Sequence, residues 1–223
     1  PIERGYGVTR SLLEVMERWR HPVALITKSQ LVIRDIDILA RLAERGLAKA
    51  AVSVTTLDRR IARVMEPRAA APHRRIETIR ALAQAGVPTT VMIAPIVPAI
   101  NDSEIETILE ECAKAGVHAA GYVVLRLPRE IKDLFREWLA QHFPDRANRV
   151  MSLVRAMRGG RDYDPAWGKR QRGEGPYARL IADRFAIACR RLHLDKPRLT
   201  LDCTQFTRPV DAGAQQDLFA AND

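Results

Sequence analysis

The stretch LAERGLAKAAVSVTT, residues 42–56, contains the pattern from which the fold can be predicted. Its first half ends an amphipathic helix at Gly46, a residue that readily takes the left-handed conformation closing many helices. Its second half is an apolar run typical of a buried strand, and that run ends in hydroxyl groups. The same order recurs in LAQAGVPTTVMIAP, residues 82–95, and in CAKAGVHAAGYVVLR, residues 112–126. The repetition predicts successive helix–strand units.

These units predict a parallel α/β sheet. The runs VALIT, AAVSV, TTVMIA and GYVVLRL alternate with helical patterns, and continuous apolar runs are typical of strands covered on both faces. An extra helix is expected near residues 58–65. Because the chain has no Gly-rich phosphate loop of the dinucleotide or P-loop type, a barrel architecture is favoured. The barrel-like part is expected to close near residue 145.

The composition changes beyond residue 145. Residues 146–205 are predicted to form a basic loop-plus-helix extension, with a helix at about 176–192 and a flexible tail at 206–223. The net charge of the 223-residue chain is +9, and residues 151–200 supply +7 of it, since they contain twelve Lys/Arg and five Asp/Glu. Such an imbalance favours a polyanionic partner.

Several classes of protein are disfavoured. No apolar run approaches the roughly 20 residues needed to span a bilayer. Cys112, Cys189 and Cys203 lie far apart without zinc-type spacing, so they are interpreted as reduced cysteines of a cytoplasmic protein. The histidines are scattered as well. No metal site can therefore be assembled from this chain alone.

Polar groups stand where each predicted strand ends. Lys28 follows the first strand, Ser53 and Thr55 the second, Asn101 the loop after the third, and Arg126 the fourth. In parallel barrels the carboxyl ends of the strands form the active site, so we expect these groups to share a rim and Lys28 to face a ligand. A ligand with a carboxylate and a ribose would suit them. Alternatively, the cations reach solvent and the hydroxyls satisfy neighbouring backbone groups.

An ordered series of segments resembles radical SAM enzymes, nearest to their spore-photoproduct-lyase-like bacterial branch. The segments are PIER, ITKS, SVTT, MEPRAAAPHRRIETIRALAQAGV, MIAPIVPAIND and GYVVLRLP. The resemblance implies a partial (β/α)6 TIM-like barrel whose last four strands lie in residues 1–145. It implies S-adenosylmethionine bound beside a [4Fe-4S] cluster. The implied activity is removal of a hydrogen atom from the substrate by a 5′-deoxyadenosyl radical, in lyase-type DNA repair or modification.

The resemblance also implies a cofactor site. Lys28 and Ser53 match positions that contact the amino-acid and ribose parts of S-adenosylmethionine, and further contacts to its adenine are expected near the ends of the last two strands. Together with the other polar groups of the rim, the expected cofactor-binding residues are Lys28, Ser53, Thr55, Pro95, Ile96, Val123, Val124 and Arg126.

Two departures from the family pattern matter. The Cys-x3-Cys-x2-Cys loop that holds the cluster follows the first strand of the family barrel, so its ligands are expected upstream of Pro1 and the chain by itself is expected to be inactive. Lacking two strands, it is also expected to expose an unpaired sheet edge. Ala99 stands where related sequences often have glycine.

A basic loop in the extension predicts contact with nucleic acid, because cations interleaved with Tyr163 and Trp167 suit phosphates and stacked bases. The residues are Arg155, Arg158, Arg161, Lys169, Arg170 and Arg172. The alternative is a solvated loop whose arginines pair with Asp162, Asp164 and Glu174.

The tail segment QQDLF resembles the pentapeptide by which bacterial DNA-repair proteins dock on the sliding clamp, with Gln215, Leu218 and Phe219 at matching positions. A short apolar pair in a polar tail can also arise by chance. Two further functions stay open. One is a non-catalytic module that binds DNA and the clamp; the other is a (β/α) barrel enzyme with an anionic small-molecule substrate held by Lys28 and Arg126.

Overall fold

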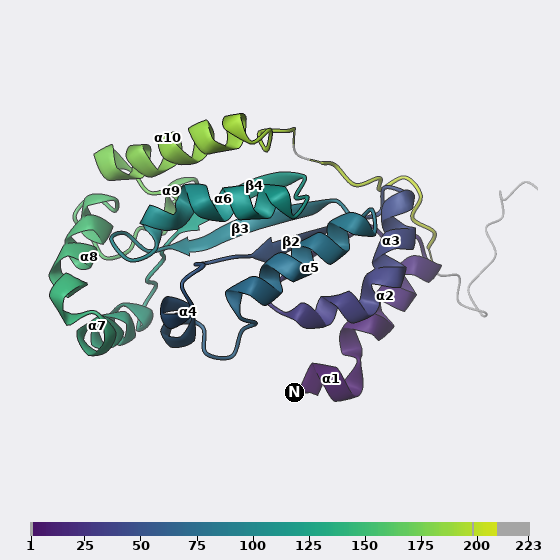
Figure 1. The fold of residues 1–223 in the computed structure, drawn as a ribbon, viewed down its shortest axis with the longest axis horizontal. Helices are drawn as coiled ribbons and strands as arrows, with labels where there is room; N and C mark the ends of the chain where they lie inside the picture. Colours follow the sequence, from purple (N-terminus) through teal and green to yellow (C-terminus); the bar gives the residue numbers. More distant parts are fainter. Residues whose placement is uncertain (1, 198, 209–223) are drawn as a thin grey trace, which may run out of the picture.

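The structure is a computed structural model, and it describes residues 2–197 and 199–208. Figure 1 shows a twisted parallel sheet with strand order β1-β2-β3-β4. The strands are β1 (Val23–Thr27), β2 (Ala48–Ser53), β3 (Thr89–Ile96) and β4 (Ala119–Val124). Val23 stands opposite Ala48, Ala50 opposite Thr89, and Thr90 opposite Ala119. The predicted parallel α/β sheet is confirmed.

Helical crossovers connect the strands. The helices are α1 (Ile2–Tyr6), α2 (Val8–Arg18), α3 (Ile36–Glu44), α4 (Arg59–Met65), α5 (Pro72–Gln84), α6 (Ile105–Lys114), α7 (Ile131–His142), α8 (Pro144–Ala156), α9 (Lys169–Arg172) and α10 (Gly175–Arg191), with 3-10 turns η1 (Gln30–Asp35) and η2 (Asp102–Glu104). The sequence patterns anticipated α3 to α6 and α10, and the amphipathic segment PREIKDLFREWLAQHF predicts α7. They did not anticipate α1, α2 and α8, nor α9, which lies in the predicted basic loop.

The glycines that end α3, α5 and α6 behave as predicted. Gly46, Gly86 and Gly116 have φ of 70°, 76° and 95°, which only glycine adopts without strain. Each glycine lets the chain leave its helix and enter the next strand after one or two residues. The local pattern thus produces the repeating helix–strand unit.

One face of the sheet is closed and the other is open. Helices α3, α5 and α6 pack on one face, where Val52, Val91 and Ile93 are fully buried (Figure 1). Half-buried and exposed side chains alternate along β1, and the exposed ones lie on the opposite face, where Ile26 is 71% exposed. The expectation that every strand is buried on both faces is therefore wrong for β1, because no layer covers that side of it in the described part of the chain.

A second, smaller core lies at the carboxyl ends of β3 and β4. It is formed by Val97, Ile100, Leu125, Leu127, Leu139, Val150, Met151 and Val154. These residues come from both sides of residue 145, where the sequence composition changes, so α7 and α8 pack directly on the loops that follow the strands. Among the described residues, no helix has the length and apolarity needed to cross a membrane.

Candidate functional site

The carboxylate of Glu66 is the centre of a polar cluster at the carboxyl ends of β1 and β2. Arg75 donates to Glu66 Oε2 over 2.6 Å and Thr55 Oγ1 donates to Oε1 over 3.0 Å. Lys28 Nζ donates to the same Oε1. The side chain of Glu66 is 10% exposed, that of Arg75 is 2% exposed, and that of Lys28 is 39% exposed. Two cations thus surround one carboxylate, which leaves an excess positive charge.

Arg75 holds this cluster to the sheet. Its guanidinium also donates to the carbonyl oxygens of Ser53, over 3.0 Å, and Ala70, over 2.7 Å. Because Ser53 ends β2 and Ala70 lies in the loop before α5, one side chain connects three segments. Sequence reasoning missed Glu66 and Arg75, although both lie in the segment MEPRAAAPHRR that carries the family resemblance.

Glu66 is ionised at neutral pH. Burial raises its pKa, but hydrogen bonds and charge from Lys28 and Arg75 outweigh burial, so the pKa lies below the ordinary value. The carboxylate therefore serves as a fixed negative charge that orients Lys28, and not as a proton donor.

Asn101 joins the ends of β2 and β3. Its amide donates to the carbonyl oxygens of Thr55 (2.7 Å) and Pro95 (3.0 Å), while its Oδ1 accepts from Val97 N–H (2.7 Å). The side chain is fully buried. The Ala94–Pro95 peptide is cis. Asn101 thus sets the position of Thr55, which in turn contacts Glu66.

The remaining predicted cofactor residues differ in access. Ser53 is 5% exposed, and the side chains of Ile96 and Val124 are fully buried, so at those two positions only the backbone can face a ligand. Pro95 and Val123 are half-buried. The row Ser53–Met92–Gly121 crosses three strands in register. Its outer members are small, but the Met92 side chain lies over Gly121, with its sulfur 2.7 Å from where a Cβ would stand, and so covers the β4 backbone there.

Arg126 marks the other end of this rim. Its Nε is buried and has no hydrogen-bond partner among the described residues, while its Nη2 makes a long 3.4 Å contact with Tyr163 Oη. Three interstrand spacings separate β4 from β1, so Arg126 lies about 14 Å from the Lys28 end. The structure therefore groups Lys28, Ser53 and Thr55, and sets Arg126 apart on the same edge.

Three of the six predicted basic residues of the extension loop are paired or buried. Arg155 pairs with Asp162 over 2.9 Å and Lys169 with Glu174 over 2.9 Å. Arg158 is 2% exposed and donates to the carbonyl oxygens of Leu125 and Lys169, and burial lowers its pKa. The cations that remain accessible are Arg161, Arg170 and Arg172; Arg170 stacks on Trp167 at 4.3 Å and Arg172 on Tyr122 at 3.8 Å. The clamp-like residues Gln215, Leu218 and Phe219 lie outside the described residues.

The residues that the structure describes do not fit an iron–sulfur cluster. Over residues 2–197 and 199–208, no three His, Cys, Asp or Glu side chains gather as metal ligands. Burial raises the pKa of the Cys112 thiol to about 12 and that of Cys189 to about 11, which disfavours the thiolates that iron requires. Cys203 is exposed and free.

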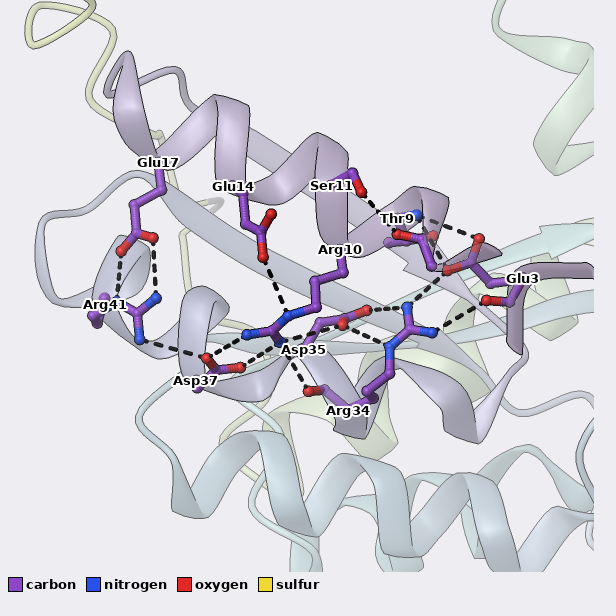
Figure 2. A network of polar contacts seen from close by, with 11 residues as sticks. Glu3, Thr9, Arg10, Ser11, Glu14, Glu17, Arg34, Asp35, Asp37 and Arg41 are labelled. Atoms are coloured by element: carbon purple, nitrogen blue, oxygen red, sulfur yellow. Dashed lines mark hydrogen bonds and ion pairs between the residues drawn. The ribbon is translucent and has the colours of Figure 1, made fainter. Parts of the chain in front are cut away.

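A chain of ion pairs fixes the N-terminal helices. Figure 2 shows Arg34, Arg10 and Arg41 alternating with the carboxylates of Glu3, Asp35, Asp37 and Glu17 across α1, α2, η1 and α3. Arg10 makes two 3.0 Å hydrogen bonds to Asp37 and holds the pKa of that carboxyl at about 2. Arg34 and the Thr9 N–H bind Glu3. The PIER segment thus has a structural role beside β1.

Comparisons with known proteins agree with this geometry. Residues 6–112 match the family model described as Radical SAM superfamily. Two curated relatives are uncharacterized proteins. The one from Mycobacterium tuberculosis is 28% identical over 155 residues, which is 69% of this chain and 46% of the relative. The one from Methanocaldococcus jannaschii is 25% identical over 146 residues, or 65% of this chain and 52% of the relative. The chain thus spans about half the length of these relatives.

Solved structures show the same fold. Spore photoproduct lyase complexed with dinucleoside spore photoproduct superposes with a TM-score of 0.58 at 17% identity, covering 83% of this chain and 54% of the lyase. A form of that lyase with bound AdoMet and the same dinucleoside gives 0.54 at 17% identity, covering 86% and 55%. The similarity confirms the predicted partial, TIM-like barrel class.

Proposed function

We propose, from the match of residues 6–112 to the Radical SAM superfamily model, that the carboxyl edge of the sheet binds S-adenosylmethionine. We further propose that the complete enzyme uses the bound cofactor to repair or modify nucleic acid. The observation that carries the first step is the unpaired, buried Nε of Arg126 on the same edge as the Lys28–Glu66–Arg75 cluster. A buried charged donor without a partner is costly unless a ligand accepts from it.

The residues at this edge suit the chemical groups of S-adenosylmethionine. Lys28 has three donor hydrogens and uses one on Glu66, so two remain for a carboxylate. The cluster carries an excess of positive charge, which suits that carboxylate, because the Glu66 oxygens are already bound by Lys28, Thr55 and Arg75. The small side chain of Ser53 lets a ribose approach β2, and a flat base reaches β4 at Gly121 once the flexible Met92 side chain moves aside.

In this proposal the protein residues bind and orient, and none of them transfers a proton. Lys28, oriented by Glu66, holds the amino-acid part, and Ser53 lies nearest the ribose. Thr55 is buried and supports Glu66 from within the protein, and Arg126 reaches the far end of the ligand. The chemistry that the resemblance assigns to the bound cofactor is hydrogen-atom removal from the substrate. Cluster ligands are not supplied by the described residues, so no step here runs through a cluster.

Nucleic acid is the proposed substrate class. Spore photoproduct lyase, which shares the fold, was solved with a dinucleoside lesion. The net charge of +9 supports a polyanionic substrate for this chain too. No comparison supports clamp binding by QQDLF, which stays a prediction from the sequence.

Calorimetric titration of S-adenosylmethionine into the chain tests the cofactor site. We expect binding by the wild type and an affinity about tenfold lower for Arg126→Gln, because one hydrogen bond to a charged group contributes about 1.5 kcal/mol or more. Arg129→Gln is the matched control, since Arg129 is exposed on the same rim. Absence of binding by the wild type, or equal binding by Arg126→Gln, would contradict the proposal. DNA binding without cofactor affinity would favour the non-catalytic module.

A further inference from the structure

Helix α4 and the loop after it present exposed arginines that the sequence reasoning did not single out. They are Arg59, Arg60, Arg63 and Arg68. In the part of the chain that the structure describes, none of these four guanidiniums makes a hydrogen bond or an ion pair. The nearby acids are otherwise engaged: Asp58 caps α4 through the N–H groups of Arg60 and Ile61, and Glu66 binds Lys28 and Arg75. None of the four arginines is therefore paired with a carboxylate of the described residues, and the segment carries a net positive charge.

The surface around these arginines is concave. Arg59 and Arg63 are four residues apart on α4, so they lie on one side of the helix about 6 Å apart along its axis. Both line a cavity of about 140 Å³ whose other walls include Glu66 and Pro67. Small side chains line the rest of it, namely Ala62, Ala69, Ala70, Ala71 and Pro72. The result is a narrow cleft with cations along one wall.

This cleft borders the candidate cofactor site. Glu66 lines the cleft and also receives the hydrogen bonds of Lys28, Thr55 and Arg75. Helix α4 starts only a few residues after β2 ends, at the carboxyl edge of the sheet. By contrast, Arg155 and Lys169 of the basic loop are paired with carboxylates and Arg158 is buried. Three arginines of that loop, Arg161, Arg170 and Arg172, make no ion pair among the described residues, against four at α4 and the loop after it.

We propose that Arg59, Arg60, Arg63 and Arg68 bind the phosphodiester backbone of the nucleic-acid substrate and so hold the target nucleotide at the carboxyl edge. This inference rests on the proposed function. Guanidinium groups bind phosphate oxygens in bidentate fashion and release counterions, which gives affinity without reading the base sequence. Because α4 lies close to Glu66, a nucleic-acid strand bound in the cleft can present its base to the proposed S-adenosylmethionine site.

Salt-dependent DNA binding by the full chain tests the inference. The variant carries Arg59→Gln, Arg63→Gln and Arg68→Gln, and fluorescence anisotropy with a DNA duplex measures the affinity at several salt concentrations. Each lost phosphate contact reduces the slope of log K against log salt by about 0.9 in magnitude. We expect a reduction of about two to three and an affinity at least about tenfold lower.

Two controls separate this site from general charge. A matched variant carries Arg45→Gln, Arg80→Gln and Arg190→Gln. It removes the same charge from exposed positions in or next to the C-terminal halves of α3, α5 and α10, away from the carboxyl edge of the sheet. Its slope should equal that of the wild type. Replacing Arg59, Arg63 and Arg68 by lysine should restore most of the slope, since lysine keeps the charge.

The outcomes distinguish the two proposals. A Gln variant that binds DNA with the slope of the wild type overturns the α4 assignment and leaves the proposed function intact. A wild type that binds no DNA overturns both. If the Gln variant instead loses binding of inorganic phosphate but keeps DNA binding, the cleft serves a small phosphate ligand and the assignment is wrong. A wild type that binds DNA but not S-adenosylmethionine contradicts only the proposed cofactor site.

Discussion

At the scale of single residues, Glu66 determines what Lys28 does. A lysine at the end of a strand can face solvent or a ligand, and here its ammonium is held by a carboxylate that lies 38 residues further along the chain. Ala99 is a second instructive residue. It has φ of 59°, a left-handed conformation that costs about 1 kcal/mol for alanine and that glycine would adopt without this cost.

Glu66 makes the free energy of unfolding depend on pH in the acidic range. Its pKa is lowered in the folded state, so its contribution to the free energy of unfolding is full above its ordinary pKa of 4.5 and is lost as the pH falls through the folded value. Glu66→Gln should cost about 3 kcal/mol at pH 7, because it leaves Arg75 buried without a charge partner. As the pH falls below 4.5, the free energy of unfolding of Glu66→Gln should decrease less than that of the wild type.

Urea unfolding between pH 7 and pH 3 measures both effects. Glu77→Gln is the control, because Glu77 pairs with Arg74 on the surface and is 43% exposed. An acid profile of Glu66→Gln that parallels the wild type would show that Glu66 has the same pKa in the folded and unfolded chain, which would contradict the prediction.

At the scale of elements, the turn after β3 holds the site together. Asn101 fills the gap between the ends of β2 and β3 with three hydrogen bonds. No local pattern specifies these partners, since one of them is 46 residues away. The turn thus connects the strand that carries Thr55 to the strand that carries Pro95.

Asn101→Ala should destabilise the protein by about 3 kcal/mol, because it leaves two buried carbonyl oxygens and one buried N–H without partners. It should also weaken S-adenosylmethionine binding, since Thr55 loses its support. Urea unfolding and calorimetric titration measure these effects. Asn148→Ala on the exposed side of α8 serves as the control. A loss no larger than that of the control would mean that the turn is held by other contacts.

At the scale of the whole molecule, the sheet is closed by helices on one side only. In the described chain β1 pairs only with β2, and its residue Ile26 is 71% exposed. The ion-pair chain of Figure 2 holds α1 and α2 beside this strand. The open edge agrees with the sequence-based expectation of an unpaired edge.

An exposed, apolar edge strand favours association between chains. We expect the purified 223-residue chain to self-associate as its concentration rises, and Ile26→Glu to suppress this with little change in stability. Analytical ultracentrifugation measures the association. Leu180→Glu on α10 is the control, because Leu180 is 48% exposed away from the edge. A wild-type chain that stays monomeric, or equal association by both variants, would contradict the prediction.

The sequence by itself determined the strands, the helices between them and the polar rim. Backbone conformation and side-chain periodicity are local, so Gly46, Gly86 and the apolar runs specify their elements without help from the rest of the chain. Only the tertiary structure decided which charges meet. The pairing of Lys28 with Glu66, the burial of Arg158 and the free arginines of α4 each depend on elements distant in sequence. Whether a charge is neutralised or exposed is set by how those elements pack, which no local pattern contains.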